Sequence, residues 1–189
     1  MPKLPLSLTH LSCSYNKLTS LPKLPNSLTE LHCHGNKLTS LPKLPNSLTT
    51  LYCFRNNLTS LPELPNSLIN IDCSDNNLIS LPKLPNSLTH LQCGNNKLTS
   101  LPELPNSLNY LSCYANNLTS LPASLLLCRN LSECYYSNNE ITLTLPLMRF
   151  FEMINNRPTN NTLYYDSQNV HNHNVQLSLI ESINTLMAD

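Results

Sequence analysis

A twenty-residue period constrains the fold of this chain more than any other feature of its sequence. The segment Leu-Pro-Lys-Leu-Pro-Asn-Ser-Leu at residues 21–28 recurs almost unchanged from residues 41, 61, 81 and 101. A fixed period of this length is typical of a solenoid, in which each repeat buries its apolar side against its neighbours. We therefore expect one continuous stack of repeats, which is a poor setting for an enzyme active site.

Each repeat carries the pattern Leu-x-x-Leu-x-Cys-x-x-Asn-x-Leu, as in residues 28–38. Leu31 and Cys33 alternate with polar residues at a period of two, as a short strand with one buried face requires. Six repeats cover residues 1–120, and a seventh follows with a three-residue insertion. The pattern predicts a curved sheet of seven short parallel strands, about 30 Å long, in which every strand pairs with neighbouring repeats.

Proline and asparagine occupy fixed positions in the repeat. Prolines at the second and fifth positions fix φ and remove N–H donors, so we expect an extended or polyproline-like convex side without helix. One asparagine follows each predicted strand, where its amide can hydrogen-bond turn backbone groups that would otherwise be buried without partners. These structural asparagines are Asn16, Asn36, Asn56, Asn76, Asn96, Asn116 and Asn139.

The repeats resemble those of the leucine-rich-repeat family over residues 1–145. Their Leu-Pro-x-Leu-Pro units are similar to those of secreted bacterial effectors and of proteins from large DNA viruses that infect amoebae. Residues 163–172 also resemble a segment of such viral proteins. The resemblance implies a leucine-rich-repeat solenoid with its sheet on the concave side, and a host-directed viral or pathogen protein as one setting.

Cysteine recurs once per repeat at an inward position that this family fills with aliphatic residues. Because parallel, in-register side chains disfavour disulfide geometry, we expect small, buried, reduced core residues. A spacing of twenty does not match paired zinc ligands, and Cys128 and Cys134 replace core leucines in the seventh repeat. Reduced thiols favour a reducing compartment, the cytoplasm of the host or source cell. The six periodic cysteines are Cys13, Cys33, Cys53, Cys73, Cys93 and Cys113.

Composition narrows the function classes further. Only two glycines are present, so the glycine-rich phosphate-binding loops are not expected, and we predict no cofactor. Eleven basic residues balance eleven acidic ones, so charge favours neither a nucleic acid nor a membrane as the partner. The first residues lack the apolar core of a signal peptide, and no segment approaches the roughly 18 apolar residues of a membrane span.

The repeats differ from one another mainly at the outward-facing strand positions, whereas the third residue of the first six repeats is always Lys or Glu. Aromatic residues and arginine, the types that dominate binding hot spots, occur among these variable residues. We therefore predict a protein-protein interaction module that binds a protein or peptide on the concave face. Neutral drift of a solvated sheet is the alternative. The predicted contact residues are His10, Glu30, His32, His34, Tyr52, Phe54, Arg55, Asp72, His90, Gln92, Tyr110, Tyr114 and Tyr135.

Two sharper chemical hypotheses concern the same face. His32 and His34 project to one side with His10 nearby, which allows a zinc ion or a pH-dependent contact. No supporting cysteine or carboxylate trio is evident, so we predict no metal. Asp72 and Asp75 could form a catalytic carboxylate pair, but a flat, open sheet is not expected to raise the pKa of either. We therefore expect no enzyme activity.

The two ends of the chain differ in pattern. Leu147, Phe150, Phe151 and Ile154 have helical spacing, and a second amphipathic pattern covers residues 175–186. We expect residues 1–145 to form the solenoid and residues 146–189 a helical cap or tail, with a partner-binding helix as the alternative. The first repeat leaves apolar residues on an unprotected edge, so a structural or self-assembling protein is the alternative function. The apolar residues of this edge are Leu4, Leu8, Leu11 and Leu18.

Overall fold

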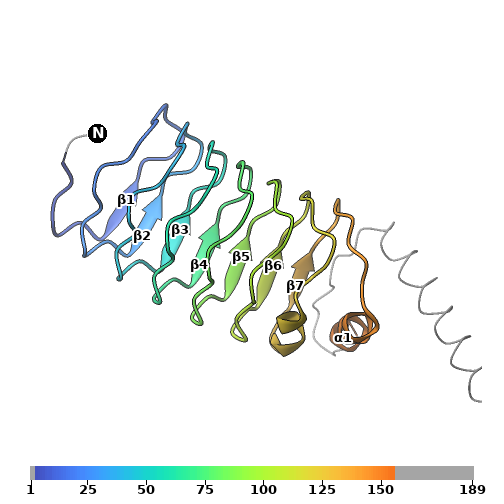
Figure 1. Ribbon diagram of the computed structural model, residues 1–189. Coiled ribbons are helices and arrows are strands. Elements are labelled where there is room, and N and C mark those ends of the chain that lie inside the picture. The colour runs from blue at the N-terminus through green and yellow to red at the C-terminus, as the bar shows by residue number, and fades with distance from the viewer. Residues whose placement is uncertain (1–2, 156–189) are drawn as a thin grey trace, which may run out of the picture.

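A single parallel sheet runs through the molecule, in a computed structural model that describes residues 3–155. Its seven strands lie in chain order, so each repeat contributes one strand to a stack of similar turns (Figure 1). The strands are β1 His10–Ser12, β2 Glu30–His32, β3 Thr50–Tyr52, β4 Asn70–Asp72, β5 His90–Gln92, β6 Tyr110–Ser112 and β7 Glu133–Tyr135. The prediction of a seven-stranded solenoid is confirmed.

The register follows the repeat length. His10 pairs with Glu30, and each later partner lies one period further along the chain up to β6. Between β6 and β7 the register instead joins Tyr110 to Glu133, because the seventh repeat carries the three inserted residues. Equivalent side chains therefore stand in columns along the sheet.

The inner side of the sheet is the core. The middle residue of β2 to β6 is buried, as with Leu31 at 0% exposure and Ile71 at 1%. All eight cysteines are buried and free, which confirms their role as small core residues. Burial raises the pKa of Cys33 to about 12, with the Cys13 thiol as a second cause, so this thiol stays protonated near neutral pH.

The asparagines hydrogen-bond backbone groups after each strand, as predicted, and they also join consecutive repeats. The Asn56 amide nitrogen donates to the carbonyls of Cys53 and Phe54 in its own repeat and of Cys33 in the preceding one. Its side-chain oxygen accepts the Leu38 N–H at 3.0 Å. One buried amide therefore satisfies four backbone groups that lie away from water.

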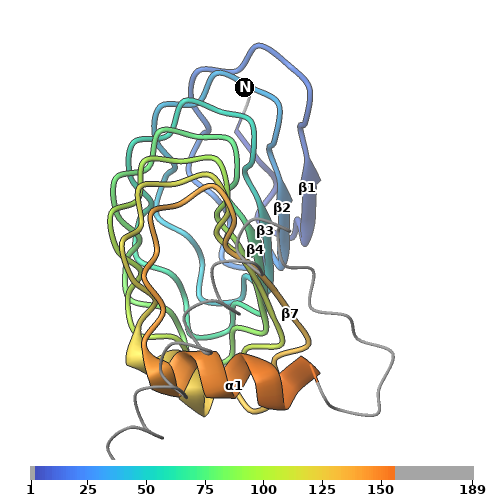
Figure 2. The same ribbon diagram turned by 90° about the vertical axis from the view of Figure 1, so that its right-hand side faces the viewer.

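The side opposite the strands is extended in the first six repeats (Figure 2). The seventh repeat differs, because a short 3-10 helix, η1 Ala123–Leu127, replaces the extended segment. Leu125 stands where the other repeats have their second proline, and its N–H donates to the Pro122 carbonyl at 3.0 Å. The prediction of a helix-free convex side was therefore wrong for this repeat, since the missing proline restores a donor.

The helix α1 Leu145–Asn155 lies across the C-terminal end of the stack and contacts η1 (Figure 2). Leu147, Phe150, Phe151 and Ile154 are buried, which confirms the helical spacing. The Phe151 ring stacks on Tyr136 with a centroid distance of 5.4 Å. The second amphipathic pattern lies outside the described residues. Within residues 3–155, no helix combines the length and apolar character needed to cross a membrane.

Candidate partner-binding face

The outward side of the sheet, which we call the concave face, carries the predicted contact residues in columns. Strand alternation turns the first and third residues of each strand outward, and the next outward residue lies two positions later. The first-residue column holds His10, Glu30, His90 and Tyr110, and the third-residue column holds His32, Tyr52, Asp72, Gln92 and Tyr135. His34, Phe54 and Tyr114 form the next column, and Arg55 follows Phe54 in the turn.

Stacked rings cover the part of the concave face nearest the N-terminus. His34 lies flat on Phe54, with a centroid distance of 4.2 Å and an interplanar angle of 8°. His32 stacks on Tyr52 at 4.8 Å, and Tyr15 meets His34 edge-on at 5.0 Å. Tyr15 was missed among the predicted contact residues, although it belongs to the same variable turn position as Arg55.

Glu30 lies between two histidines of neighbouring strands. His10 Nε2 is 3.3 Å from one Glu30 carboxylate oxygen, and His32 Nε2 is 3.8 Å from the other. The second distance is too long for a hydrogen bond, and His32 Nε2 is buried without a hydrogen-bond partner. Within residues 3–155, no group of three His, Cys, Asp or Glu side chains is arranged to hold a metal ion, so the zinc hypothesis gains no support.

The ring of His34 is partly shielded from water and lies close to titratable groups. Burial lowers its pKa, and the neighbouring His32 lowers it further, while Asp72 acts in the opposite direction. Its Nδ1 atom lies 2.9 Å from the Ser14 hydroxyl of the preceding repeat. These contacts favour a neutral imidazole stacked on its neighbours at neutral pH.

Two aspartates at the centre of the concave face differ in their partners. Asp75 lies 3.5 Å from Arg55 Nε and also accepts a hydrogen bond from the Asn95 side chain. Asp72 accepts the Ser74 N–H at 3.0 Å and forms no ion pair with any residue between 3 and 155. Burial raises the pKa of Asp72, so the expectation that an open sheet could not do so was wrong. Neighbouring side chains desolvate this carboxylate without forming a closed pocket.

Tyrosines cover the part of the concave face nearest the C-terminus. Tyr110 lies between His90 at 6.0 Å and Tyr135 at 5.7 Å, both measured between ring centroids. The Tyr135 hydroxyl donates to Glu133 at 2.8 Å. Burial raises the pKa of Tyr110, and the Glu133 carboxylate adds to the shift.

Tyr114 lies across the backbone of Gly94 in the neighbouring repeat. Its ring atoms occupy the space that a Cβ atom at Gly94 would need, so any larger residue there would displace the ring. Tyr114 is 36% exposed and offers part of its face to a partner. The outward position of Tyr114 was predicted from the sequence, whereas its place above Gly94 was not.

The repeats match a known family model and known folds. Residues 6–46 match the family model described as leucine-rich repeats in two copies. The chain has the leucine-rich-repeat fold. Curated protein sequences give no significant match to this leucine-rich-repeat chain.

Solved structures of bacterial effectors are similar to this leucine-rich-repeat protein. YopM from Yersinia enterocolitica shares 40% identity over 76% of this chain and 31% of its own, with a TM-score of 0.72. The leucine-rich effector YopM from Yersinia pestis shares 40% over 69% of this chain and 37% of its own, with a TM-score of 0.66. A Shigella effector leucine-rich-repeat domain shares 38% over 72% of this chain and 61% of its own, with a TM-score of 0.67.

This chain therefore spans about a third of both YopM structures and less than two thirds of the Shigella domain. None of the three matches indicates a catalytic family. They also give no support to the resemblance to viral proteins, since all three structures are bacterial.

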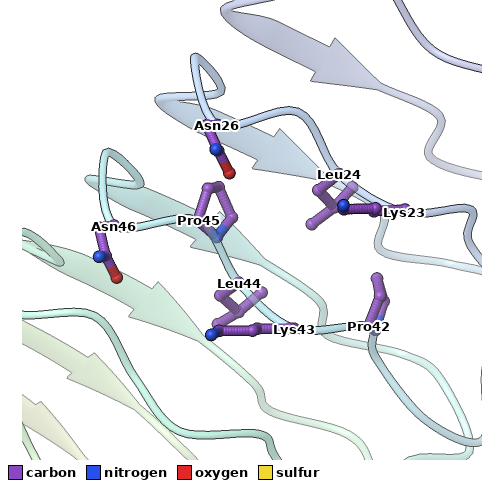
Figure 3. A pocket seen from close by; sticks show the side chains of 8 residues that line it. All are labelled: Lys23, Leu24, Asn26, Pro42, Lys43, Leu44, Pro45 and Asn46. Atoms are coloured by element: carbon purple, nitrogen blue, oxygen red, sulfur yellow. The ribbon is translucent and has the colours of Figure 1, made fainter. Parts of the chain in front are cut away.

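The convex side of the leucine-rich-repeat protein carries similar grooves between neighbouring repeats. Figure 3 shows one between the second and third repeats, where Lys23 and Lys43 lie beside Leu24, Leu44 and Pro45. A similar groove between the fourth and fifth repeats has Glu63 and Lys83 at the same positions. Because nearly the same residues line each groove, this side offers less to distinguish one partner from another than the concave face.

Proposed function

We propose that this protein is an interaction module that binds a protein or peptide on its concave face. The observation that carries the proposal is the contrast between columns. Inward residues are nearly constant from repeat to repeat, and the convex third position is always Lys or Glu in the first six repeats, whereas the outward residues of the strands include acids, amides, histidines, small residues and aromatics. The similarity to bacterial effectors supports a host-directed role and, with the free thiols, a cytoplasmic site of action.

The contacts on this face fit a binding surface. His34 and Phe54 are already stacked in the free chain, as are His32 and Tyr52. Rings held in this way lose little conformational freedom when a partner covers them, so more of the contact energy appears as affinity. Aromatic side chains also dominate the energetic centres of known interfaces.

The test is a capture experiment from host-cell lysate with a triple variant of Tyr52, Phe54 and Tyr114 to alanine. We expect a partner that the parent retains and the variant loses, while circular dichroism shows that the variant stays folded. The matched control replaces Lys23, Glu63 and Glu103 with alanine on the convex side. The captured protein is then purified, and its affinity for the parent and both variants is measured by calorimetry. Equal affinity for all three proteins would refute the proposal.

Self-association through the N-terminal edge is a second candidate function. Leu8 and Leu11 are only partly buried, whereas the equivalent Leu28 and Leu31 of the next repeat are both at 0% exposure. Apolar surface of this kind favours association with another surface. Sedimentation velocity over a range of concentrations tests this function. A dimer that a Leu8→Asp variant converts to monomer supports it, and a parent that stays monomeric excludes it.

A further inference from the structure

The charged groups of the concave face are unevenly distributed by sign. Four carboxylates belong to it, and Arg55 is its one permanent cation among residues 3–155. All seven lysines of the chain fall at the third or seventeenth position of a repeat, away from the outward strand columns. A protein with no formal net charge therefore presents an acidic surface on this side. The four carboxylates are Glu30, Asp72, Asp75 and Glu133.

Three of these carboxylates already have partners within the chain. Glu30 lies beside His10 and His32, and Asp75 beside Arg55. Glu133 accepts the Tyr135 hydroxyl. Asp72 alone combines partial burial with the absence of any ion pair to residues 3–155, and its hydrogen bonds come from the backbone N–H and the side chain of Ser74. A desolvated carboxylate gains from any cation that a partner brings.

Aromatic rings lie around this carboxylate. Asp72 pairs in register with Tyr52 on one side and with Gln92 on the other. Phe54 and Tyr114 belong to the next column, and the Tyr114 ring lies over Gly94 in β5's repeat, which is next to the repeat of Asp72. Burial raises the pKa of the Tyr114 hydroxyl, and the carboxylates of Asp75 and Asp72 add to that shift, which agrees with their proximity. Rings beside a carboxylate are a favourable environment for an ammonium or guanidinium group.

We infer that the concave face binds a basic segment of its partner protein, with one arginine or lysine side chain paired with Asp72 and packed against Tyr52 and Tyr114. The inference rests on the proposed function and names the chemistry of the ligand. A partner with an acidic segment would meet four carboxylates and would be repelled. Charge complementarity of this kind also speeds encounter at low ionic strength.

The chain contains a convenient reporter for this inference. Its two glycines are Gly35, which lies under Tyr15, and Gly94, which lies under Tyr114 near Asp72. Glycine amides resonate in their own region of a ¹H–¹⁵N spectrum, so both signals can be followed in one titration. The probe is N-acetyl-arginine methylamide, and its neutral isostere N-acetyl-citrulline methylamide is the matched control.

We expect the arginine probe to shift the Gly94 signal in a saturable way, with a Kd on the order of 1 to 10 mM for so small a molecule. Citrulline should leave Gly94 unchanged, and Gly35 should respond to neither probe. Asp72→Asn should weaken arginine binding by at least about tenfold, since a charge-assisted contact is lost. Glu103→Gln on the convex side should have no effect.

A Gly94 signal that ignores arginine, or that responds equally to citrulline, overturns the inference. So does full arginine binding by the Asp72→Asn variant. These failures are separable from failure of the proposed function. If the triple alanine variant still loses its lysate partner while Gly94 ignores arginine, then the concave face binds a partner without a cation at Asp72.

Discussion

The inner and outer faces of the same strands obey different constraints. In β4, Ile71 points into the core and is 1% exposed, while Asn70 and Asp72 on either side point outward. Across the repeats, the inner position is leucine in five strands, isoleucine in one and cysteine in one, whereas the outer positions hold acids, amides, histidines and aromatics. A change of side-chain volume on the close-packed inner face destabilises the fold, whereas the same change on the solvated outer face has little effect on stability. The outer face is therefore where one repeat can differ from another without loss of the fold.

A pair of neighbouring substitutions in β4 tests this contrast with the largest expected effect. Ile71→Ala should lower the free energy of unfolding by about 2 to 5 kcal/mol, because it leaves a cavity between stacked repeats. Asn70→Ala, one residue away, should change it by less than about 0.5 kcal/mol. Urea denaturation followed by circular dichroism measures both. Similar losses for the two variants would contradict the division between faces.

The asparagine column should show the next largest effect. Asn56→Ala should lower the free energy of unfolding by about 2 to 3 kcal/mol, since the Leu38 N–H and the Cys33 carbonyl lose a partner away from water. Asn57 is the adjacent exposed residue, and Asn57→Ala is the control. Denaturation of both variants is compared with the parent. A loss shared equally by Asn57→Ala would show that the buried amide has no special role.

A smaller effect is expected at the turn that follows each strand. Ala115 has φ of 50°, and the equivalent Gly35 has φ of 66°, both in the left-handed region that glycine adopts without strain. Ala115→Gly should therefore raise the free energy of unfolding by about 1 kcal/mol. Gly35→Ala should lower it, because the new Cβ would lie 2.6 Å from a ring carbon of Tyr15. Thermal unfolding of both variants measures these changes. An Ala115→Gly variant less stable than the parent would contradict the assignment of backbone strain to Ala115.

The smallest effect concerns the pKa of His34. Because burial lowers this pKa in the folded chain, the unfolded chain binds the proton more readily. The contribution of His34 to stability is therefore complete above the ordinary histidine pKa of about 6.5, and decreases as pH falls from there through the folded pKa. An NMR titration of the ring proton checks the direction of the shift. A folded pKa above the ordinary value would be inconsistent with the stacked, neutral ring, and a His34→Phe variant should lose this part of the pH dependence.

Sequence reasoning succeeded wherever one repeated pattern decided the outcome. The period fixed the number and direction of strands, and alternation assigned Leu31 and Cys33 to the core and His32 and His34 to the opposite face. It failed where a single repeat departs from the pattern. The 3-10 helix η1 arises because Leu125 replaces a proline and restores an N–H donor, which a rule based on the other six repeats does not anticipate.

The sequence by itself determined the stack, its buried columns and the face on which variable residues gather, because these depend on periodicity and burial alone. Only the tertiary structure decided how side chains on that face meet. Tyr114 leans over Gly94, Tyr15 joins His34, and Arg55 pairs with Asp75 rather than with Asp72. Alternation gives the side of the sheet to which a residue points, whereas rotamers and contacts between neighbouring repeats determine the direction that it takes there.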